Sequence, residues 1–228
     1  ENSMRLSADG AWLLNARRVL SPNCDDRPDG CGVSLIVVHG ISLPPGEYGG
    51  RWIDDLFTNR LDPDAHPYFA EICDLRVSSH VLIRRTGELV QYVPFTRRAW
   101  HAGQSCYGTQ QACNDFAVGI ELEGQDEEPY EAVQYRQLAA LIRVLRERFP
   151  AIGACDIVGH SDIAPGPPDP EPMTLAGVPV APTICYEDAY GSEQLYALPE
   201  AKLLINVSND AWFGDSIAPM QHLQIARM

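Results

Sequence analysis

The chain has 228 residues, 45% of them hydrophobic, which is enough for one large domain with a substantial buried core. Its formal net charge of −14 argues against nucleic acid or an anionic membrane surface as a partner. No apolar run reaches the roughly 18 residues of a membrane span, and no secretory leader is visible. Seven cysteines at irregular spacings, without a Cys-x-x-Cys motif, indicate free thiols in a reducing cytoplasm.

The first strong element is a buried strand. Residues 4–31 are polar and rich in turn residues, which predicts one or two short strands and a surface loop. The apolar run at 34–38 then predicts a buried strand that ends at His39. A single histidine after a strand is more often a hydrogen-bonded core residue than a ligand, so His39 matters only beside other site residues. Short helices are expected at 49–57 and 67–72.

The remaining elements of this part mix strands with one long helix. Residues 77–93 have the alternation and central turn of a β-hairpin, and 116–122 read as a further strand. Apolar residues at helical spacing predict an amphipathic helix over 131–149, ended by the proline that follows. A short strand at 156–158 leads to His160. Without strict βαβ alternation, these elements predict an α/β or α+β fold, with a central mixed sheet flanked by helices.

The sequence changes character after a proline-rich stretch at 165–172. Beyond it, strands are predicted at 178–184 and 203–207. We therefore divide the chain into a domain at 1–170 and a separate segment at 171–228. The apolar strands of a segment this short leave unpaired edges, so we expect it to be loosely ordered.

The residues allow a zinc hydrolase. A catalytic zinc site needs three protein ligands and an open position, and His39, His160 and Asp169 could supply the ligands. An amide hydrolase also needs a carboxylate to move the proton of the attacking water, and Glu121 ends a predicted buried strand. The alternative is that Glu121 is a surface residue paired with Glu123, since strand alternation puts both on one side.

Residues 33–170 resemble the 1,6-anhydro-N-acetylmuramyl-L-alanine amidase family (amidase type 2). The matching motifs include Val37-Val38-His39, Trp100-His101-Ala102-Gly103 and Gly159-His160-Ser161-Asp162. The matched stretches are residues 37–39, 41–46, 53–57, 64–67, 76–80, 90–95, 98–103, 113–116, 119–124 and 159–165. So long a set of matches is specific to this family.

The resemblance implies a cytoplasmic zinc amidase that cuts the amide between the lactyl group and L-alanine of anhydro-muropeptides during cell-wall recycling. It implies that His39, His160 and Asp169 bind zinc and that Glu121 is the general base. We expect a monomer whose partner is the anhydro-muropeptide substrate.

Further residues of the matched stretches are given roles by the same resemblance. Arg76 and Trp100 match positions that line the substrate cleft of the family. Three more histidines lie in matched stretches and are interpreted as structural residues: His66, His80 and His101.

Two departures from the family pattern concern the metal site. The family has His-Asn where this chain has His39-Gly40. Its third-ligand loop reads Arg-Lys-x-Asp-Pro-Gly, whereas the loop here is one residue shorter and has Pro167 at the lysine position. That lysine resembles an electrophilic catalyst, and losing such a donor typically costs on the order of 10²–10³ in rate. Asp162 is a possible substitute ligand, although bracing the loop is its more ordinary role.

Residues 174–228 resemble part of the nitrilase-type domain of apolipoprotein N-acyltransferase. The motifs are 182–191, 206–215 and 221–228, and Cys185 matches the nucleophile of that family. The glutamate, lysine and membrane helices of that family are absent, so Cys185 is interpreted as a vestigial nucleophile. The chain thus reads as a fusion of an amidase with a nitrilase fragment.

Three functions follow. The first is a zinc amidase impaired by the altered loop. The second is a non-catalytic module that binds muropeptides, if Asp169 does not reach the metal. The third is a thiol acyltransferase at Cys185, which is disfavoured because one member of a triad leaves little catalysis.

Overall fold

The computed structural model describes residues 4–125 and 128–164, and beyond them four strands at 173–175, 178–184, 203–207 and 223–226. The chain forms two compact units, Glu1–Pro165 and Gly166–Met228, each of which is described by itself. Asp169 and Cys185, predicted as site residues, lie outside the described residues, as does most of the segment expected to be loosely ordered.

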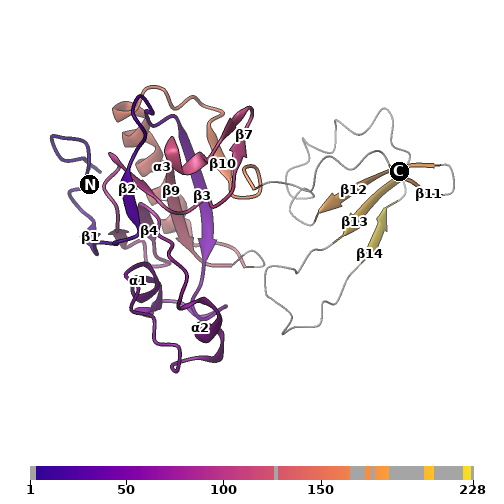
Figure 1. Ribbon diagram of the computed structural model, residues 1–228, viewed down its shortest axis with the longest axis horizontal. Helices are drawn as coiled ribbons and strands as arrows, with labels where there is room; N and C mark the ends of the chain where they lie inside the picture. The colour runs from indigo at the N-terminus through magenta and orange to yellow at the C-terminus, as the bar shows by residue number, and fades with distance from the viewer. Residues whose placement is uncertain are drawn as a thin grey trace. The chain divides into compact units, whose positions relative to one another are not determined.

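A six-stranded mixed sheet forms the centre of the first unit, in the order β1-β5-β4-β9-β3-β10 (Figure 1). Its strands are β1 (Arg17–Arg18), β3 (Leu35–Ile41), β4 (Val81–Ile83), β5 (Leu89–Gln91), β9 (Ala117–Glu123) and β10 (Ile157–Gly159). Strand β3 lies between β9 and β10 and is parallel to both. Strands β4 and β5 are antiparallel, so the predicted mixed sheet is confirmed.

Shorter elements surround this sheet. The helices are α1 (Trp52–Phe57), α2 (Pro67–Ile72), α3 (Ala132–Arg148) and the 3₁₀ turn η1 (Cys113–Asp115). Two small ribbons pair β2 (Cys24–Asp26) with β6 (Arg97–Ala99) and β7 (Cys106–Tyr107) with β8 (Gln110–Gln111). Both short helices and the long helix were predicted within a few residues of these bounds.

The helix α3 covers one face of the sheet (Figure 1). It begins with a capping box, in which the side chain of Glu131 accepts from the backbone of Gln134 and Gln134 bonds the backbone N–H of Glu131. Leu141 and Leu145 are fully buried against the sheet. Pro150 follows the last turn, as the predicted stop requires.

The alternation of side chains along β3 decides where its histidine points. Ile36 and Val38 pack in the cluster that includes α3, whereas Leu35 and Val37 pack in a separate cluster. Because side chains alternate along a strand, His39 shares the face of Leu35 and Val37. The long helix therefore covers the back of the site and leaves the other face of β3 for chemistry.

The hairpin is shorter than its sequence pattern. The alternation at 77–83 predicted a longer first strand, but β4 spans only Val81–Ile83. All three residues are buried, because Val81 and Ile83 pack toward α3 while Leu82 packs with α1 and α2 on the opposite face. A central strand covered on both faces shows no polar face.

The second unit contains a four-stranded sheet in the order β11-β12-β13-β14. The strands are β11 (Met173–Leu175), β12 (Val178–Ile184), β13 (Leu203–Val207) and β14 (Leu223–Ala226). The two strands predicted in this segment are present with their predicted bounds, and they pair in parallel with each other. Each also pairs antiparallel with one outer strand.

Two expectations drawn from the composition concern the cysteines and membrane-spanning helices. Six cysteines there are free thiols: Cys24, Cys31, Cys73, Cys106, Cys113 and Cys155. None of the described helices combines the length and apolar character needed to cross a bilayer.

Candidate active site

Two histidines that are 121 residues apart meet on neighbouring strands. The strand predicted to end at His39 continues to Ile41, so His39 lies within β3, whereas His160 directly follows β10. Strand β10 runs parallel to β3, with Val158 opposite Val37 and Gly159 opposite Val38. The residue after Gly159 is His160, so the register brings it alongside His39. The Nδ1 atoms of the two rings are 3.1 Å apart, and the ring centroids are 4.9 Å apart.

Glu121 lies directly across from His39 on the other neighbouring strand. The register of β3 and β9 pairs His39 with Glu121, and parallel partners project to the same face. Glu121 is only 7% exposed, so the alternative interpretation as a surface residue is wrong. Burial raises the pKa of Glu121 to about 8, and no cation of the described residues offsets that effect.

Glu123, two residues further along β9, has a different environment. Its carboxylate accepts from Arg84 Nη1 at 2.9 Å, from the N–H of Gly49 at 2.7 Å and from the N–H of Arg85 at 3.1 Å. The side chains of Glu123 and Arg84 are almost completely buried, so this is a buried ion pair with its hydrogen bonds made. Glu123 braces the fold, whereas the carboxyl group of Glu121 on the same strand has no ion pair with any described residue.

A third histidine joins the site. His101 follows β6, and its Nδ1 is 3.0 Å from Nε2 of His39. The two rings meet edge to face, with centroids 5.1 Å apart. The sequence interpretation placed His101 among structural residues and missed this contact, because the ring lies over Gly119, a residue 18 positions away on another strand.

The histidines of this cluster are held neutral. Burial lowers the pKa of His39 well below its usual value, and the nearby His101 and His160 lower it further. Burial also lowers the pKa of His160 and, well below its usual value, that of His101. Only neutral imidazole binds a metal ion, so this environment suits ligands.

The spacing of the His39 and His160 rings is close to that of two zinc ligands. Two ligands on a tetrahedral zinc, each about 2.0–2.1 Å away, lie about 3.3 Å apart, close to the 3.1 Å between the Nδ1 atoms of His39 and His160. Within residues 4–125 and 128–164, no group of three His, Cys, Asp or Glu side chains is placed to hold a metal. The spacing of the two imidazoles fits two ligands of such a site.

Asp162, considered as a substitute ligand, is engaged with the backbone. Its Oδ2 accepts from the N–H of Gly159 at 2.6 Å, across the turn that carries His160. This contact fixes the turn and matches the bracing role expected of the residue.

The two residues predicted to bind substrate have local partners. The indole N–H of Trp100 donates to Asp25 at 3.1 Å, and Arg98 beside it lowers the pKa of Asp25 to about 2. The exposed Arg76 donates over 3.4 Å to the carbonyl of Cys73. Neither side chain has a hydrogen bond or ion pair to His39, Glu121 or His160 among the described residues.

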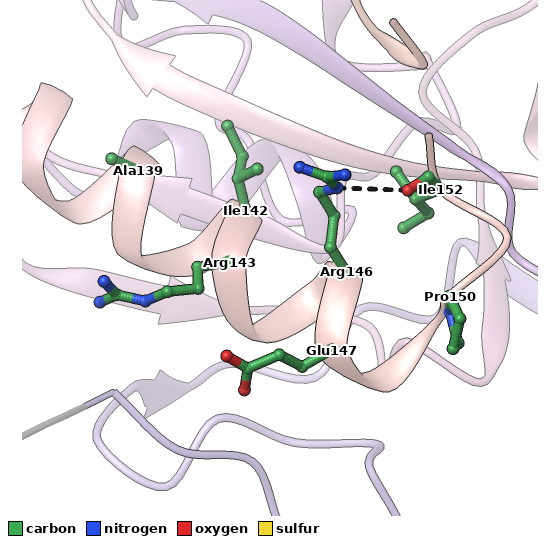
Figure 2. A pocket seen from close by; sticks show the side chains of 7 residues that line it. All are labelled: Ala139, Ile142, Arg143, Arg146, Glu147, Pro150 and Ile152. Atoms are coloured by element: carbon green, nitrogen blue, oxygen red, sulfur yellow. Dashed lines mark hydrogen bonds between the residues drawn. The ribbon is translucent and has the colours of Figure 1, made fainter. Parts of the chain in front are cut away.

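A separate hollow lies along α3, away from the predicted site residues (Figure 2). Its lining residues are Ala139, Ile142, Arg143, Arg146, Glu147, Pro150 and Ile152. Arg146 donates to the carbonyl of Ile152 at 3.2 Å and so closes the helix onto the following turn (Figure 2). This hollow contains no histidine and no unpaired buried carboxylate, so it is not the candidate site.

Comparison with known proteins identifies relatives for each part of the chain. The profile of the N-acetylmuramoyl-L-alanine amidase family matches residues 29–172. The 1,6-anhydro-N-acetylmuramyl-L-alanine amidase AmpD of Salmonella typhimurium strain SL1344 is 62% identical over 157 residues, which are 69% of this chain and 83% of that protein. The AmpD amidase of Escherichia coli K12 is 61% identical over 154 residues, 68% of this chain and 84% of that protein.

Solved structures agree with this assignment. A crystal structure of a selenomethionine AmpD derivative matches with a TM-score of 0.69 and 58% identity, covering 74% of this chain and 92% of that one. The solution structure of Citrobacter freundii AmpD matches with a TM-score of 0.52 and 57% identity, covering 72% of this chain and 89% of that one.

The C-terminal part matches a second family. The carbon-nitrogen hydrolase profile covers residues 133–228, so both profiles include 133–172, the range that contains Asp169. The apolipoprotein N-acyltransferase of Nitrosomonas europaea is 59% identical over 68 residues. That match covers 30% of this chain but only 14% of the relative.

Proposed function

The chain belongs to the N-acetylmuramoyl-L-alanine amidase family and is an enzyme of that class, and we propose that it is a zinc-dependent hydrolase of 1,6-anhydro-muropeptides. The bond cut is the amide between the lactyl group of the muramoyl sugar and L-alanine. The observation that carries the proposal is the convergence of His39 and His160 beside the buried carboxyl group of Glu121.

We propose that His39, His160 and Asp169 hold the zinc ion. The two histidines support the proposal with neutral rings whose Nδ1 atoms face each other. When bound, zinc lowers the pKa of water and polarises an amide carbonyl. The carboxylate of Asp169 would complete the three protein ligands usual for a catalytic site.

Glu121 is the proposed general base. Its carboxyl group is in register with His39 and is removed from water. Once ionised, a carboxylate with a raised pKa is a stronger proton acceptor, so it can take a proton from the attacking water and then give it to the departing amine of L-alanine. Burial supplies this tuning, since no cation lowers the pKa of Glu121.

Substrate contacts and location complete the proposal. Trp100 and Arg76 are proposed to contact the muropeptide in the cleft. The free thiols of the described cysteines are compatible with a reducing compartment, which supports action in the cytoplasm on recycled cell-wall fragments. A monomer is sufficient, because all the proposed site residues come from one chain.

The test of the proposed activity is hydrolysis of a purified anhydro-muropeptide, followed by mass spectrometry. We expect the free peptide with an N-terminal L-alanine and the anhydro-sugar with a free lactyl carboxylate. Binding of the muropeptide without either product, even with added zinc, would instead support the second candidate, a recognition module. That candidate is favoured by one observation, the lack of a third ligand among the described residues.

The third ligand can be identified by a matched pair of variants. Asp169→Asn is expected to weaken zinc binding by about 100-fold or more, because it replaces an ionised ligand by a neutral amide. Asp162→Asn should keep its zinc affinity, since Asp162 bonds the backbone of Gly159. Competition with a chromophoric chelator measures both affinities. The reverse pattern would make Asp162 the ligand.

A further inference from the structure

The ring of His101 occupies a position prepared for it on the sheet. A Cβ atom at Gly119 would lie 2.5 Å from Cγ of His101, so glycine is required on β9 for the ring to lie there. The backbone is also fixed, because the N–H groups of His101 and Ala102 both donate to Oδ1 of Asn114, at 3.1 and 2.9 Å. His101 is thus placed beside His39 by two separate segments of the chain, at Gly119 and Asn114.

The contact between His101 and His39 joins specific atoms. A neutral imidazole has one N–H donor and one acceptor nitrogen. The Nδ1 of His39 faces Nδ1 of His160, and its Nε2 faces Nδ1 of His101. If Nδ1 of His39 is to keep a lone pair for a metal, its proton must be on Nε2. The partner of that proton is then Nδ1 of His101, acting as the acceptor.

The other nitrogen of His101 is consistent with this direction. If Nδ1 of His101 accepts, its proton is on Nε2. That nitrogen is buried and makes no hydrogen bond of good geometry within the described residues. The assignment of the proton therefore rests on the contact between Nδ1 of His101 and Nε2 of His39.

We propose that His101 is a positioning residue: its Nδ1 accepts a hydrogen bond from Nε2 of His39 and so holds His39 in the tautomer whose Nδ1 is bare and faces His160. Such outer partners orient a ligand ring and raise its basicity, and their loss typically weakens metal binding by about 10–100-fold. The role as a metal ligand rests on the proposed function, whereas the tautomer of His39 can be measured without metal.

A merely structural role for His101 predicts something else. In that case the ring fills space, and its removal lowers stability without changing the chemistry of His39. The two roles are separated by His101→Asn, because Oδ1 of asparagine stands close to where Nδ1 of histidine stood and can also accept. His101→Leu fills similar space without an acceptor.

The experiment uses the full chain in four variants. His101→Leu removes the acceptor, His101→Asn keeps it, and Gly119→Ala displaces the ring without changing its chemistry. Leu145→Ala is the matched control, since it destabilises the core on the α3 side without touching the histidines. Long-range ¹H–¹⁵N NMR spectra of the metal-free proteins report the ring tautomer of His39, and chelator competition reports the zinc Kd.

The expected results divide the proteins into those that keep the tautomer of His39 and those that lose it. His39 carries its proton on Nε2 in the unmodified chain and in His101→Asn. In His101→Leu and Gly119→Ala the tautomer is mixed or reversed, and the zinc Kd rises by about 10–100-fold. Leu145→Ala melts at a lower temperature but keeps the tautomer and, within about threefold, the Kd.

Two results would overturn the inference. One is a proton on Nδ1 of His39 in the unmodified metal-free chain, and the other is an unchanged tautomer in His101→Leu. If the unmodified chain shows the expected tautomer but binds no zinc, the zinc-dependent function fails while the positioning role of His101 stands. Should His101→Leu fail to fold, His101→Asn and Gly119→Ala still decide between the two roles.

Discussion

Glu121→Gln is expected to reduce hydrolysis by about 10²–10⁴-fold and to stabilise the metal-free chain at neutral pH. The amide cannot accept the proton of water, so the activity falls. It also cannot ionise, so it avoids the cost of a buried charge. A gain in stability at an active-site position is typical of residues kept for chemistry.

The pH dependence of this gain follows from the raised pKa of Glu121, which is about 8 in the folded chain against 4.5 for an ordinary glutamate. Below pH 4.5 the carboxyl group is protonated in both the folded and unfolded states, so the unmodified chain and Glu121→Gln should be equally stable. Between these pH values only the unfolded state releases its proton, so the free energy of unfolding falls as the pH rises. At pH 8 the free energy of unfolding of Glu121→Gln should exceed that of the unmodified chain by roughly 3–5 kcal/mol. Urea unfolding of the metal-free proteins measures this difference.

Glu123→Gln is the control, two residues away on the same strand. Its carboxylate pairs with the buried guanidinium of Arg84, which would be left without its closest partner. Breaking a buried pair in this way costs about 3 kcal/mol or more, so this variant should be less stable while its folded fraction keeps amidase activity. Equal loss of activity in both variants, or destabilisation by Glu121→Gln at pH 8, would contradict the proposed base.

Pro167→Lys is expected to raise kcat by about 10²–10³-fold. In the resemblance described above, the family has lysine at this position, where a cation would stabilise the negative charge that develops on the amide oxygen. A positively charged donor in a site shielded from water is worth far more than one in bulk solvent.

The control for this gain is Pro167→Met, which has a side chain of similar length without charge and removes the same proline ring. Steady-state kinetics on the anhydro-muropeptide compare the two variants. If methionine raises kcat as much as lysine, backbone freedom and not charge explains the change. If neither raises kcat, the altered loop is not what limits the rate.

The elements that carry the site were predictable from local pattern. The apolar runs of β3 and β9 exceed what a surface strand would contain, and α3 has a capping box, an apolar stripe and a final proline. Local pattern therefore predicts that His39, Glu121 and His160 lie on or next to buried strands. The structure adds the register, which brings these residues into line across three neighbouring strands.

Other features depend on tertiary contacts that no local pattern contains. Glu121 and Glu123 are the same residue type on the same face of one strand, and their environments differ because Arg84 and the N–H groups of Gly49 and Arg85 bond only Glu123. The position of His101 depends on the missing side chain of Gly119. The predicted ligand Asp169 lies in a range that both family profiles match, and it is outside the residues that the structure describes.

The zinc content of the purified chain, measured together with anhydro-muropeptide hydrolysis, tests the central claim most directly. We predict about one zinc ion per chain, loss of hydrolysis when a chelator removes it, and recovery when zinc is restored. A chain that binds no zinc and releases no peptide after zinc is added would contradict the account. His39 and His160 would then face each other in a site that recognises cell-wall fragments without cutting them.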